Sequence, residues 1–232
     1  RARSPMNIVG EALEIAQREM AERFDFVDEY FPSEPAWLSR FCAVWKAQVA
    51  RPFRFTAIAE SLSAQNLAAL KDAGCEAIRL HIDTGNEKFR ARIATRNLGN
   101  ARLASVCAEA ARLGIRVDIH AMTGLPLEHP DLATETVEFI RALKSDSVSI
   151  SFYAPIPGTP LFEFARDKQR EVDPADFNPR RPRMRLASMD DADALRAYDA
   201  LARLRRQRMI ERAVQIDAYA DWVGQADSAI VE

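Results

Sequence analysis

Extended patterns that end in turns or loops recur along this sequence at a nearly constant spacing. The strand patterns end near Asp28, Glu60, Asp83, Gly124 and Pro155, with helical patterns between them. The spacing is roughly thirty residues, the length of one strand plus its crossover helix. Alternation of this kind predicts a parallel sheet with right-handed crossovers. The sequence itself does not repeat, so a solenoid is not expected.

The predicted strands carry polar residues on one of their two faces. Arg79, His81 and Asp83 alternate with apolar residues in one strand, and Asp118 and His120 do so in the next. Strands buried on both faces are nearly continuously apolar, so one face of this sheet is expected to contact water or a ligand. The architecture that fits best is an open, incomplete α/β barrel of the TIM type with a substrate cavity. The other residues assigned to this inner face are Arg54, Thr56, Glu60, Ser149, Ser151 and Tyr153.

The stretch from Arg116 to Leu143 is one complete strand, turn and helix. The turn is Gly124-Leu125-Pro126, where the period-two pattern stops before a helical pattern resumes. Gly124 allows the backbone to approach another group closely. Because α/β proteins hold ligands at the carboxyl ends of their strands, this turn is predicted to border a binding site.

Composition and charge narrow the class of protein. The formal net charge is −2 and the sequence pI is about 6.0, so no overall basic field favours nucleic acid or an anionic membrane. No run of about eighteen apolar residues predicts a membrane span, and the start does not resemble a signal peptide. Three well-separated cysteines fit a reducing compartment. We therefore expect a cytoplasmic protein that binds neither membranes nor nucleic acid.

Two parts are expected along the chain. Residues 1–165 hold the barrel pattern, and residues 166–232 hold a Pro- and Arg-rich loop followed by a helical extension. Ser188 and Asp191 resemble a capping box at the start of that extension, which is expected to run to about Ala220. We interpret its many arginines as a solvated face rather than a phosphate or nucleic-acid site. They are Arg203, Arg205, Arg206, Arg208 and Arg212.

Six short segments, taken in order, resemble motifs of one enzyme family. They are RSPMNIVGE, FVDEYF, LKDAGC, HIDTGNE, MTGLPLE and APIPGTPLF, and together they span Arg3 to about Phe164. This set resembles the radical S-adenosylmethionine (SAM) superfamily, in particular its cobalamin-binding branch. The resemblance implies an open, partial (β/α)6 TIM-type barrel whose first strand is missing from this chain, followed by a C-terminal helical extension.

The Cys-x-x-x-Cys-x-x-Cys motif of that family does not occur in this sequence. In the family it binds a [4Fe-4S] cluster and lies just upstream of where this chain starts, which suggests a fragment. Cys42, Cys75 and Cys107 are too far apart to replace it and are interpreted as buried apolar residues. We therefore expect no metal ligands in this chain, and we expect that the chain alone neither assembles the cluster nor turns over.

The resemblance also implies roles for individual residues around SAM. Asp28 and Glu29 match groups that accept hydrogen bonds from the SAM amino group, and Arg96 matches an arginine that contacts its carboxylate. Asp83 stands where the family often has Glu or Gln on the ribose hydroxyls, and His120 is a second candidate ribose contact. The expected adenine contacts are Gly124, Leu125 and Pro126 after one strand and Ala154, Pro155 and Ile156 after the next.

The substrate and partners are less defined by the sequence. Arg54, Arg79, His81 and Tyr153 are candidate substrate contacts, which weakly favours a polar or anionic small molecule. The resemblance implies an electron donor such as flavodoxin or ferredoxin, and cobalamin as a possible further cofactor. Two alternatives remain open. One is a cluster-free barrel used as a binding or scaffold module, and the other is an unrelated metal-dependent barrel enzyme that uses His81, His120 and Asp83.

Overall fold

The computed structural model describes residues 3–94, 96–165, 182, 186 and 188–228, and from residue 215 onward it describes only the helical backbone. Most of the loop predicted over residues 166–187 lies outside these ranges. None of the helices in the described ranges is both long and apolar enough to cross a membrane.

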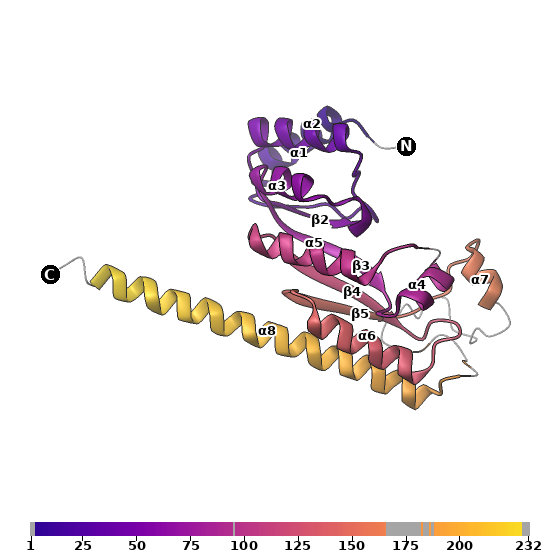
Figure 1. The fold of residues 1–232 in the computed structure, drawn as a ribbon. Helices are drawn as coiled ribbons and strands as arrows, with labels where there is room; N and C mark the ends of the chain where they lie inside the picture. The colour runs from indigo at the N-terminus through magenta and orange to yellow at the C-terminus, as the bar shows by residue number, and fades with distance from the viewer. Residues whose placement is uncertain (1–2, 95, 166–181, 183–185, 187, 229–232) are drawn as a thin grey trace.

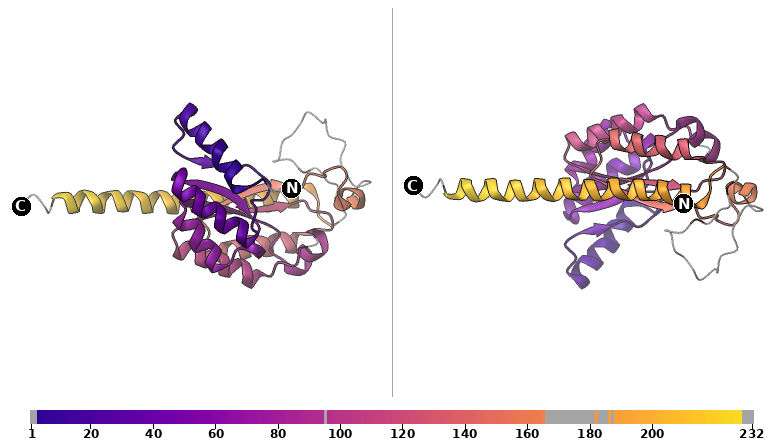
Figure 2. Two further views of the ribbon diagram at one scale, coloured as in Figure 1. Left: turned by 90° about the horizontal axis from the view of Figure 1, so that it is seen from above. Right: turned by 90° about the horizontal axis from the view of Figure 1, so that it is seen from below.

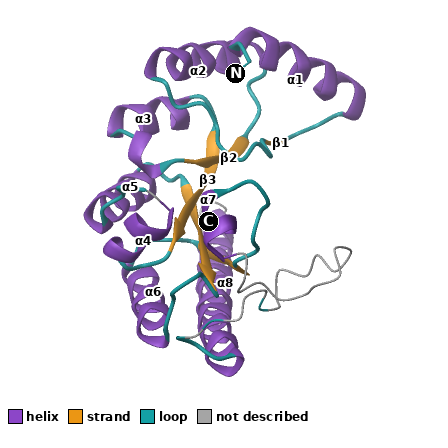
Figure 3. Ribbon diagram, turned by 90° about the vertical axis from the view of Figure 1, so that its right-hand side faces the viewer, coloured by secondary structure: helices purple, strands orange, loops and turns teal. Residues whose placement is uncertain are grey.

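Five parallel strands form one sheet in the sequential order β1-β2-β3-β4-β5. The sheet curls into a half-barrel, with helices packed on its convex face and the concave face left open (Figures 1 and 3). This confirms the prediction of an α/β, open, partial TIM-type barrel with a C-terminal helix. The strands are β1 (Phe24–Asp25), β2 (Phe53–Ala57), β3 (Cys75–Asp83), β4 (Arg116–Thr123) and β5 (Ser147–Phe152).

The helices alternate with the strands as the sequence predicts. Ser4 caps the first helix, since its hydroxyl accepts a hydrogen bond from the Asn7 amide at 3.2 Å and Pro5 follows it. The helices are α1 (Pro5–Glu19), α2 (Pro35–Gln48), the 3-10 turn η1 (Ala59–Ser61), α3 (Ala64–Asp72), α4 (Glu87–Ala94), α5 (Asn100–Arg112), α6 (Pro130–Ala142), α7 (Pro160–Ala165) and α8 (Asp191–Ser228).

The first strand is shorter than predicted. An extended pattern over 24–29 suggested one continuous strand, but β1 ends at Asp25 and residues 27–30 bulge outward. The amides of Phe26 and Phe31 donate to β2 carbonyls at 2.9 Å, and both rings pack against Phe41. Phe31 thus takes the pairing position that residue 28 would have held in a continuous strand, and Asp28 and Glu29 are exposed on the bulge.

Helix α8 lies along β5 and α6 and extends well past the sheet (Figure 2). Leu201 and Leu204 join the main apolar core, so the start of the extension packs into the barrel. The helix begins at Asp191 with Asp190 as its cap, whereas the Ser188 hydroxyl donates to the Glu128 carbonyl at 2.5 Å. The helix also runs beyond the predicted end at Ala220.

The strand register places polar side chains in rows across the concave face. Arg79 of β3 lies beside Asp118 of β4, which lies beside Ser147 of β5. One row nearer the carboxyl ends, His81 lies beside His120, and His120 beside Ser149. The opposite face carries the Ile, Leu and Val side chains of the core. The concave face is therefore polar from end to end.

Candidate functional site

Two histidines and a serine meet on the carboxyl half of the concave face. The ring centroids of His81 and His120 are 4.6 Å apart, and His120 Nε2 lies 3.2 Å from the Ser151 hydroxyl. His120 Nδ1 is buried and has no hydrogen-bond partner among the described residues. Burial, with the charge of His81 as a further cause, lowers the pKa of His120 to about 4. The imidazole is therefore neutral at pH 7, with one unused nitrogen.

An arginine ties the ends of β2 and β3 together beside these rings. Arg96 donates to both carboxylate oxygens of Glu60 at 3.2 and 3.0 Å, to Asp83 Oδ2 at 3.2 Å and to the His81 carbonyl at 2.7 Å. Its side chain is 17% exposed and that of Asp83 is 11% exposed. These four contacts use four of the five guanidinium N–H groups, so one remains for a ligand.

Asp83 holds an unusual backbone conformation. Its φ is 59°, in the left-handed region, and the pairing of β3 with β4 shifts register between His81 and Asp83. This conformation is costly for a residue other than glycine, and such strain gathers at binding sites. The kink turns the Asp83 carboxylate toward Arg96 instead of continuing the concave-face row.

The predicted SAM amino contacts lie at the rim of this cluster. Asp28 and Glu29 are exposed on the bulge after β1. The neighbouring Tyr30 ring lies 6.2 Å from that of His81, which places the bulge over the histidine pair. Burial raises the pKa of the Tyr30 hydroxyl, so it is a neutral donor near pH 7.

The turn after β4 is held by a buried carboxylate that the sequence did not single out. Glu128 Oε2 accepts from the amides of Gly124 at 2.6 Å and Leu125 at 3.3 Å, and from the Thr123 hydroxyl at 3.1 Å. Its Oε1 is buried without a partner in the described part of the chain, and burial raises its pKa to about 7. The only sequence signal was its position as the last residue of MTGLPLE.

That carboxylate changes what the turn can offer a ligand. Gly124, Leu125 and Pro126 are all buried, and the first two amides already bind Glu128. Gly124 has a φ of 76°, and an added Cβ would lie 3.2 Å from the Phe152 ring. Contact of these residues with adenine stays a prediction, and it would have to use the packed surface of the turn rather than these two N–H groups.

The segment after β5 divides into an accessible and a buried part. Ala154 and Pro155 are half-buried and Ile156 is exposed, so the predicted adenine-edge segment is open to a ligand. Tyr153 instead packs in a second apolar cluster with Phe89 and Leu125, and its hydroxyl is buried with no partner among the described residues. The structure thus separates Tyr153 from the other predicted substrate contacts.

The loop after β3 is fixed by a buried arginine that sequence reasoning also missed. Arg90 is fully buried and donates to the carbonyls of Ile82 at 2.8 Å, Thr84 at 2.5 Å and Leu98 at 2.5 Å. In the same loop a Cβ on Gly85 would lie 2.6 Å from Thr136 Cα of α6. These contacts position HIDTGNE, and with it Asp83, against the helix layer.

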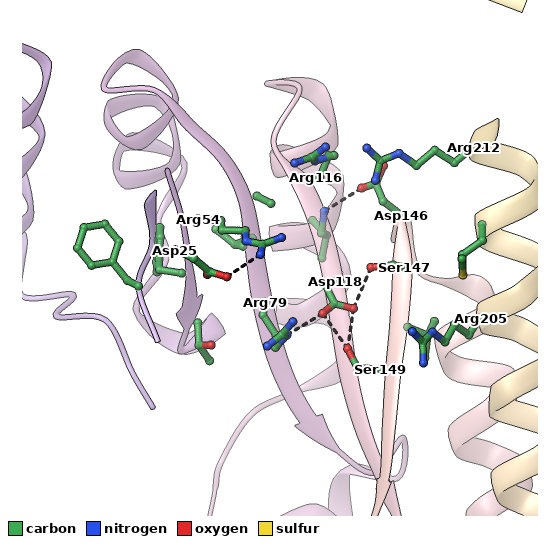
Figure 4. A pocket seen from close by; sticks show the side chains of 18 of the residues that line it. Asp25, Arg54, Arg79, Arg116, Asp118, Asp146, Ser147, Ser149, Arg205 and Arg212 are labelled. Atoms are coloured by element: carbon green, nitrogen blue, oxygen red, sulfur yellow. Dashed lines mark hydrogen bonds and ion pairs between the residues drawn. The ribbon is translucent and has the colours of Figure 1, made fainter. Parts of the chain in front are cut away.

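The predicted substrate residues Arg54 and Arg79 lie in the amino-terminal half of the concave face. They line a cavity of about 570 Å³ that also involves α8 (Figure 4). Arg79 Nε donates to Asp118 at 2.7 Å, and the same carboxylate accepts from the hydroxyls of Ser147 at 2.9 Å and Ser149 at 2.8 Å. The candidate site at the carboxyl ends is defined by contacts between side chains. The cavity lies at the amino-terminal end of the sheet, away from that site.

The arginines of α8, interpreted from the sequence as a solvated face, have different surroundings in the structure. Arg205 and Arg212 line the cavity, whereas Arg208 donates to the carbonyls of Arg141 at 3.0 Å and Leu143 at 3.2 Å, at the end of α6. Arg203, Arg205 and Arg206 are all exposed, and Arg208 and Arg212 are half-buried.

The cysteines are unsuited to hold a metal. Cys42, Cys75 and Cys107 are buried in α2, β3 and α5, and burial raises their pKa values to about 11, 12 and 12. Metal ligation needs the thiolate, which burial disfavours. Within the ranges that the structure covers, no group of three or more His, Cys, Asp or Glu side chains could hold a metal ion, and the Asp83 carboxylate is engaged by Arg96.

Comparison with solved structures identifies similar folds. Radical S-adenosylmethionine methyltransferase TsrM from Kitasatospora setae, solved with tryptophan and a SAM analogue, matches with a TM-score of 0.64 and 16% identity over 77% of this chain and 37% of its own. Coproporphyrinogen III oxidase HemN from Escherichia coli, a radical SAM enzyme, matches with a TM-score of 0.58 and 17% identity over 88% of this chain and 47% of its own.

A third similar structure is the cobalamin-dependent SAM radical enzyme OxsB, with a TM-score of 0.54 and 15% identity over 71% of this chain and 25% of its own. No family model and no curated protein sequence matches the chain. The chain spans less than half the length of these three structures. The fold of the described residues is therefore that of radical SAM enzymes, including cobalamin-dependent ones.

Proposed function

We propose that this chain is the core of a radical SAM enzyme that holds SAM at the carboxyl ends of its strands and a small-molecule substrate over the concave face. The main support is the half-barrel fold, similar to TsrM, HemN and OxsB. It coincides with a strained polar cluster, Asp83, Arg96 and His120, at the strand ends where α/β barrels bind ligands.

The polar groups at these strand ends suit the parts of SAM. Its ammonium group needs acceptors, and Asp28 and Glu29 are exposed carboxylates at the rim. Its carboxylate needs donors, and Arg96 retains one N–H. The buried Nδ1 of His120 has no protein partner in the described ranges, and a ribose hydroxyl would satisfy it.

The described residues do not suit an iron–sulfur cluster, because their thiols are buried and held protonated. The proposal therefore places the cluster ligands in sequence outside this chain, together with any cobalamin-binding segment. Radical chemistry would be supplied by SAM with a reduced cluster, and an electron carrier such as flavodoxin or ferredoxin would reduce it. This chain would position SAM and substrate and exclude water from them.

Binding of SAM to this chain tests the proposal without requiring turnover. Calorimetry should detect binding to the wild-type chain, and Asp83→Asn or His120→Gln should weaken it about tenfold, the loss of one or two hydrogen bonds. Arg54→Gln, at the other end of the concave face, is the matched control and should bind as the wild type does. Absence of binding, or equal loss in the control, would refute the assignment.

The cluster prediction is tested separately. Anaerobic reconstitution of this chain with iron and sulfide should give no site-bound [4Fe-4S] spectrum. A longer natural chain with three upstream cysteines should give one. If no such cysteines precede the chain but SAM still binds, a cluster-free binding module becomes the better description.

A further inference from the structure

The cavity at the amino-terminal half of the concave face is strongly basic. Its lining includes six arginines and three aspartates, a formal excess of three positive charges in a protein whose net charge is −2. The arginines come from every side of the cavity: Arg23 and Arg54 near β1 and β2, Arg79 and Arg116 on β3 and β4, and Arg205 and Arg212 on α8. Local charge here is thus opposite to that of the whole chain.

The aspartates are occupied by partners inside the protein. Asp118 accepts from Arg79 and two serine hydroxyls, and Asp146 Oδ2 accepts from the Val117 amide at 2.8 Å. Asp25 accepts from Arg54 at 2.6 Å. Each aspartate keeps its negative charge, and Glu76 pairs with Arg23 at 3.4 Å and with Arg116 at 3.5 Å. Arg205 and Arg212 are therefore the cavity arginines without an ion pair among the described residues.

Several arginines in the cavity still have N–H groups that could donate to a bound ligand. Arg79 uses only Nε toward Asp118, which leaves its two terminal nitrogens free to donate. Arg205 and Arg212 have no hydrogen bond or ion pair with any described residue. They lie seven positions apart on α8, about two turns. In Figure 4, Arg205 points toward β5 near Ser149, and Arg212 points toward the start of β5, where Asp146 lies.

The position of α8 is itself fixed. Arg208, on the same helix, donates to two carbonyls at the end of α6, while Leu201 and Leu204 pack in the core. The backbone that carries Arg205 and Arg212 therefore has a fixed position next to the cavity. Such preorganised forks bind phosphate or carboxylate groups with parallel hydrogen bonds.

We propose that this cavity, between α8 and the amino-terminal halves of β2 to β5, binds a small organic anion with at least two negative charges. Its size, about 570 Å³, suits a single small molecule. The anionic group would be held by Arg205, Arg212 and the terminal nitrogens of Arg79. This assignment stands apart from SAM binding, which involves the other end of the sheet.

Calorimetry with inorganic pyrophosphate and with succinate as separate probes tests the proposal and distinguishes phosphate from carboxylate ligands. At least one probe should bind the wild-type chain at moderate salt with one site per chain. The double variant Arg205→Gln/Arg212→Gln should weaken binding about tenfold or more, since charged hydrogen bonds are lost. The control Arg203→Gln/Arg206→Gln removes the same charge from exposed positions of α8 and should change affinity less than twofold.

Circular dichroism and a thermal scan of each variant establish that the fold is retained. If neither probe binds the wild-type chain, or if the two double variants lose affinity equally, the cavity is not a specific anion site and the proposal fails. Arg79→Gln provides a second check. It should weaken binding of the anionic probe and leave the affinity for SAM unchanged.

Discussion

The two ends of the concave face are both polar but are built in different ways. At the carboxyl ends, the side chains of Arg96 and Asp83 are 17% and 11% exposed, and Arg96 donates to Asp83, to Glu60 and to the His81 carbonyl. At the amino ends, Arg79 and Arg54 are 52% and 51% exposed, and each donates to a single carboxylate. At the carboxyl ends the side chains are fixed and most N–H donors are used. At the amino ends several N–H donors remain free in a solvated cavity.

This difference predicts at which end substitutions lower the free energy of unfolding most. Exposed ion pairs contribute about 0 to 1 kcal/mol, because water screens them and the side chains lose entropy. A buried polar group without its partners costs about 1 to 3 kcal/mol. Substitutions at the carboxyl ends should therefore be much more damaging than matched ones at the amino ends.

The largest effect is expected at Arg90. Arg90→Met keeps most of the side-chain volume but leaves the buried carbonyls of Ile82, Thr84 and Leu98 without their donor. We expect a loss of at least about 3 kcal/mol in the free energy of unfolding. Urea denaturation measures it, with Arg92→Met on the exposed side of the same helix as control. A loss below about 1 kcal/mol would mean that the loop is not held by this residue.

The next effect is a pH dependence that originates at His120. Its pKa is about 4 in the fold against 6.5 as the unperturbed value, so the unfolded chain binds more protons between these pH values. The contribution of His120 to stability should fall as pH drops from 6.5 toward 4, by at most roughly 3 kcal/mol. His81, whose pKa burial also lowers, adds in the same direction. Glu128, whose pKa burial raises to about 7, acts in the opposite direction over this range.

Urea titrations at several pH values measure that slope. His120→Gln should remove the positive contribution of His120, so that the free energy of unfolding rises less, or falls, as pH increases from 4 to 6.5. His129→Gln, at an exposed position, should leave the slope of the wild type unchanged. An unchanged slope in His120→Gln would show that the histidine pair does not carry the effect.

A smaller loss is expected where the loop after β3 meets α6. Gly85→Ala would place a Cβ 2.6 Å from Thr136 Cα, so backbone must move, and we expect a cost of about 1 to 3 kcal/mol. The control is Gly10→Ala in α1, where nothing lies within 4 Å and a gain of about 0.5 to 1 kcal/mol is expected. Thermal unfolding of both variants provides the measurement, and a neutral Gly85→Ala would show that the contact is loose.

The smallest effect on stability is expected at the amino end. Arg79→Gln removes the exposed ion pair with Asp118, while Ser147 and Ser149 still donate to that carboxylate. The free energy of unfolding should change by less than about 1 kcal/mol. A loss comparable to that of Arg90→Met would overturn the comparison between the two ends.

The sequence predicted the half-barrel and its polar face because both follow from local patterns. Period-two alternation through Arg79, His81, Asp118 and His120 fixes which side chains share a face, and parallel pairing then sets them in rows. The family resemblance implied separate SAM contacts for Asp83 and Arg96, which stay predictions, and the structure adds a 3.2 Å ion pair between the two side chains.

The sequence did not predict features that depend on how distant segments meet. Arg90 looks like one more charged residue of a short helix, and its burial follows from the carbonyls that the kinked end of β3 turns toward it. The sequence did not show that Arg205 and Arg212 line a cavity, because the other walls of that cavity are strands far away in sequence. The early end of β1 arises because Phe31, and not Asp28, donates to the Thr56 carbonyl and packs in the core.

The placement of α8 along β5 bears on how this sheet can associate with other strands. A sheet edge with open backbone groups is a template for further pairing, in assembly or in aggregation. The helix shields the β5 side, so strand addition is directed to β1, where only two residues are paired with β2. We therefore expect a further strand to pair at the β1 edge, where it would widen the concave face rather than cover it.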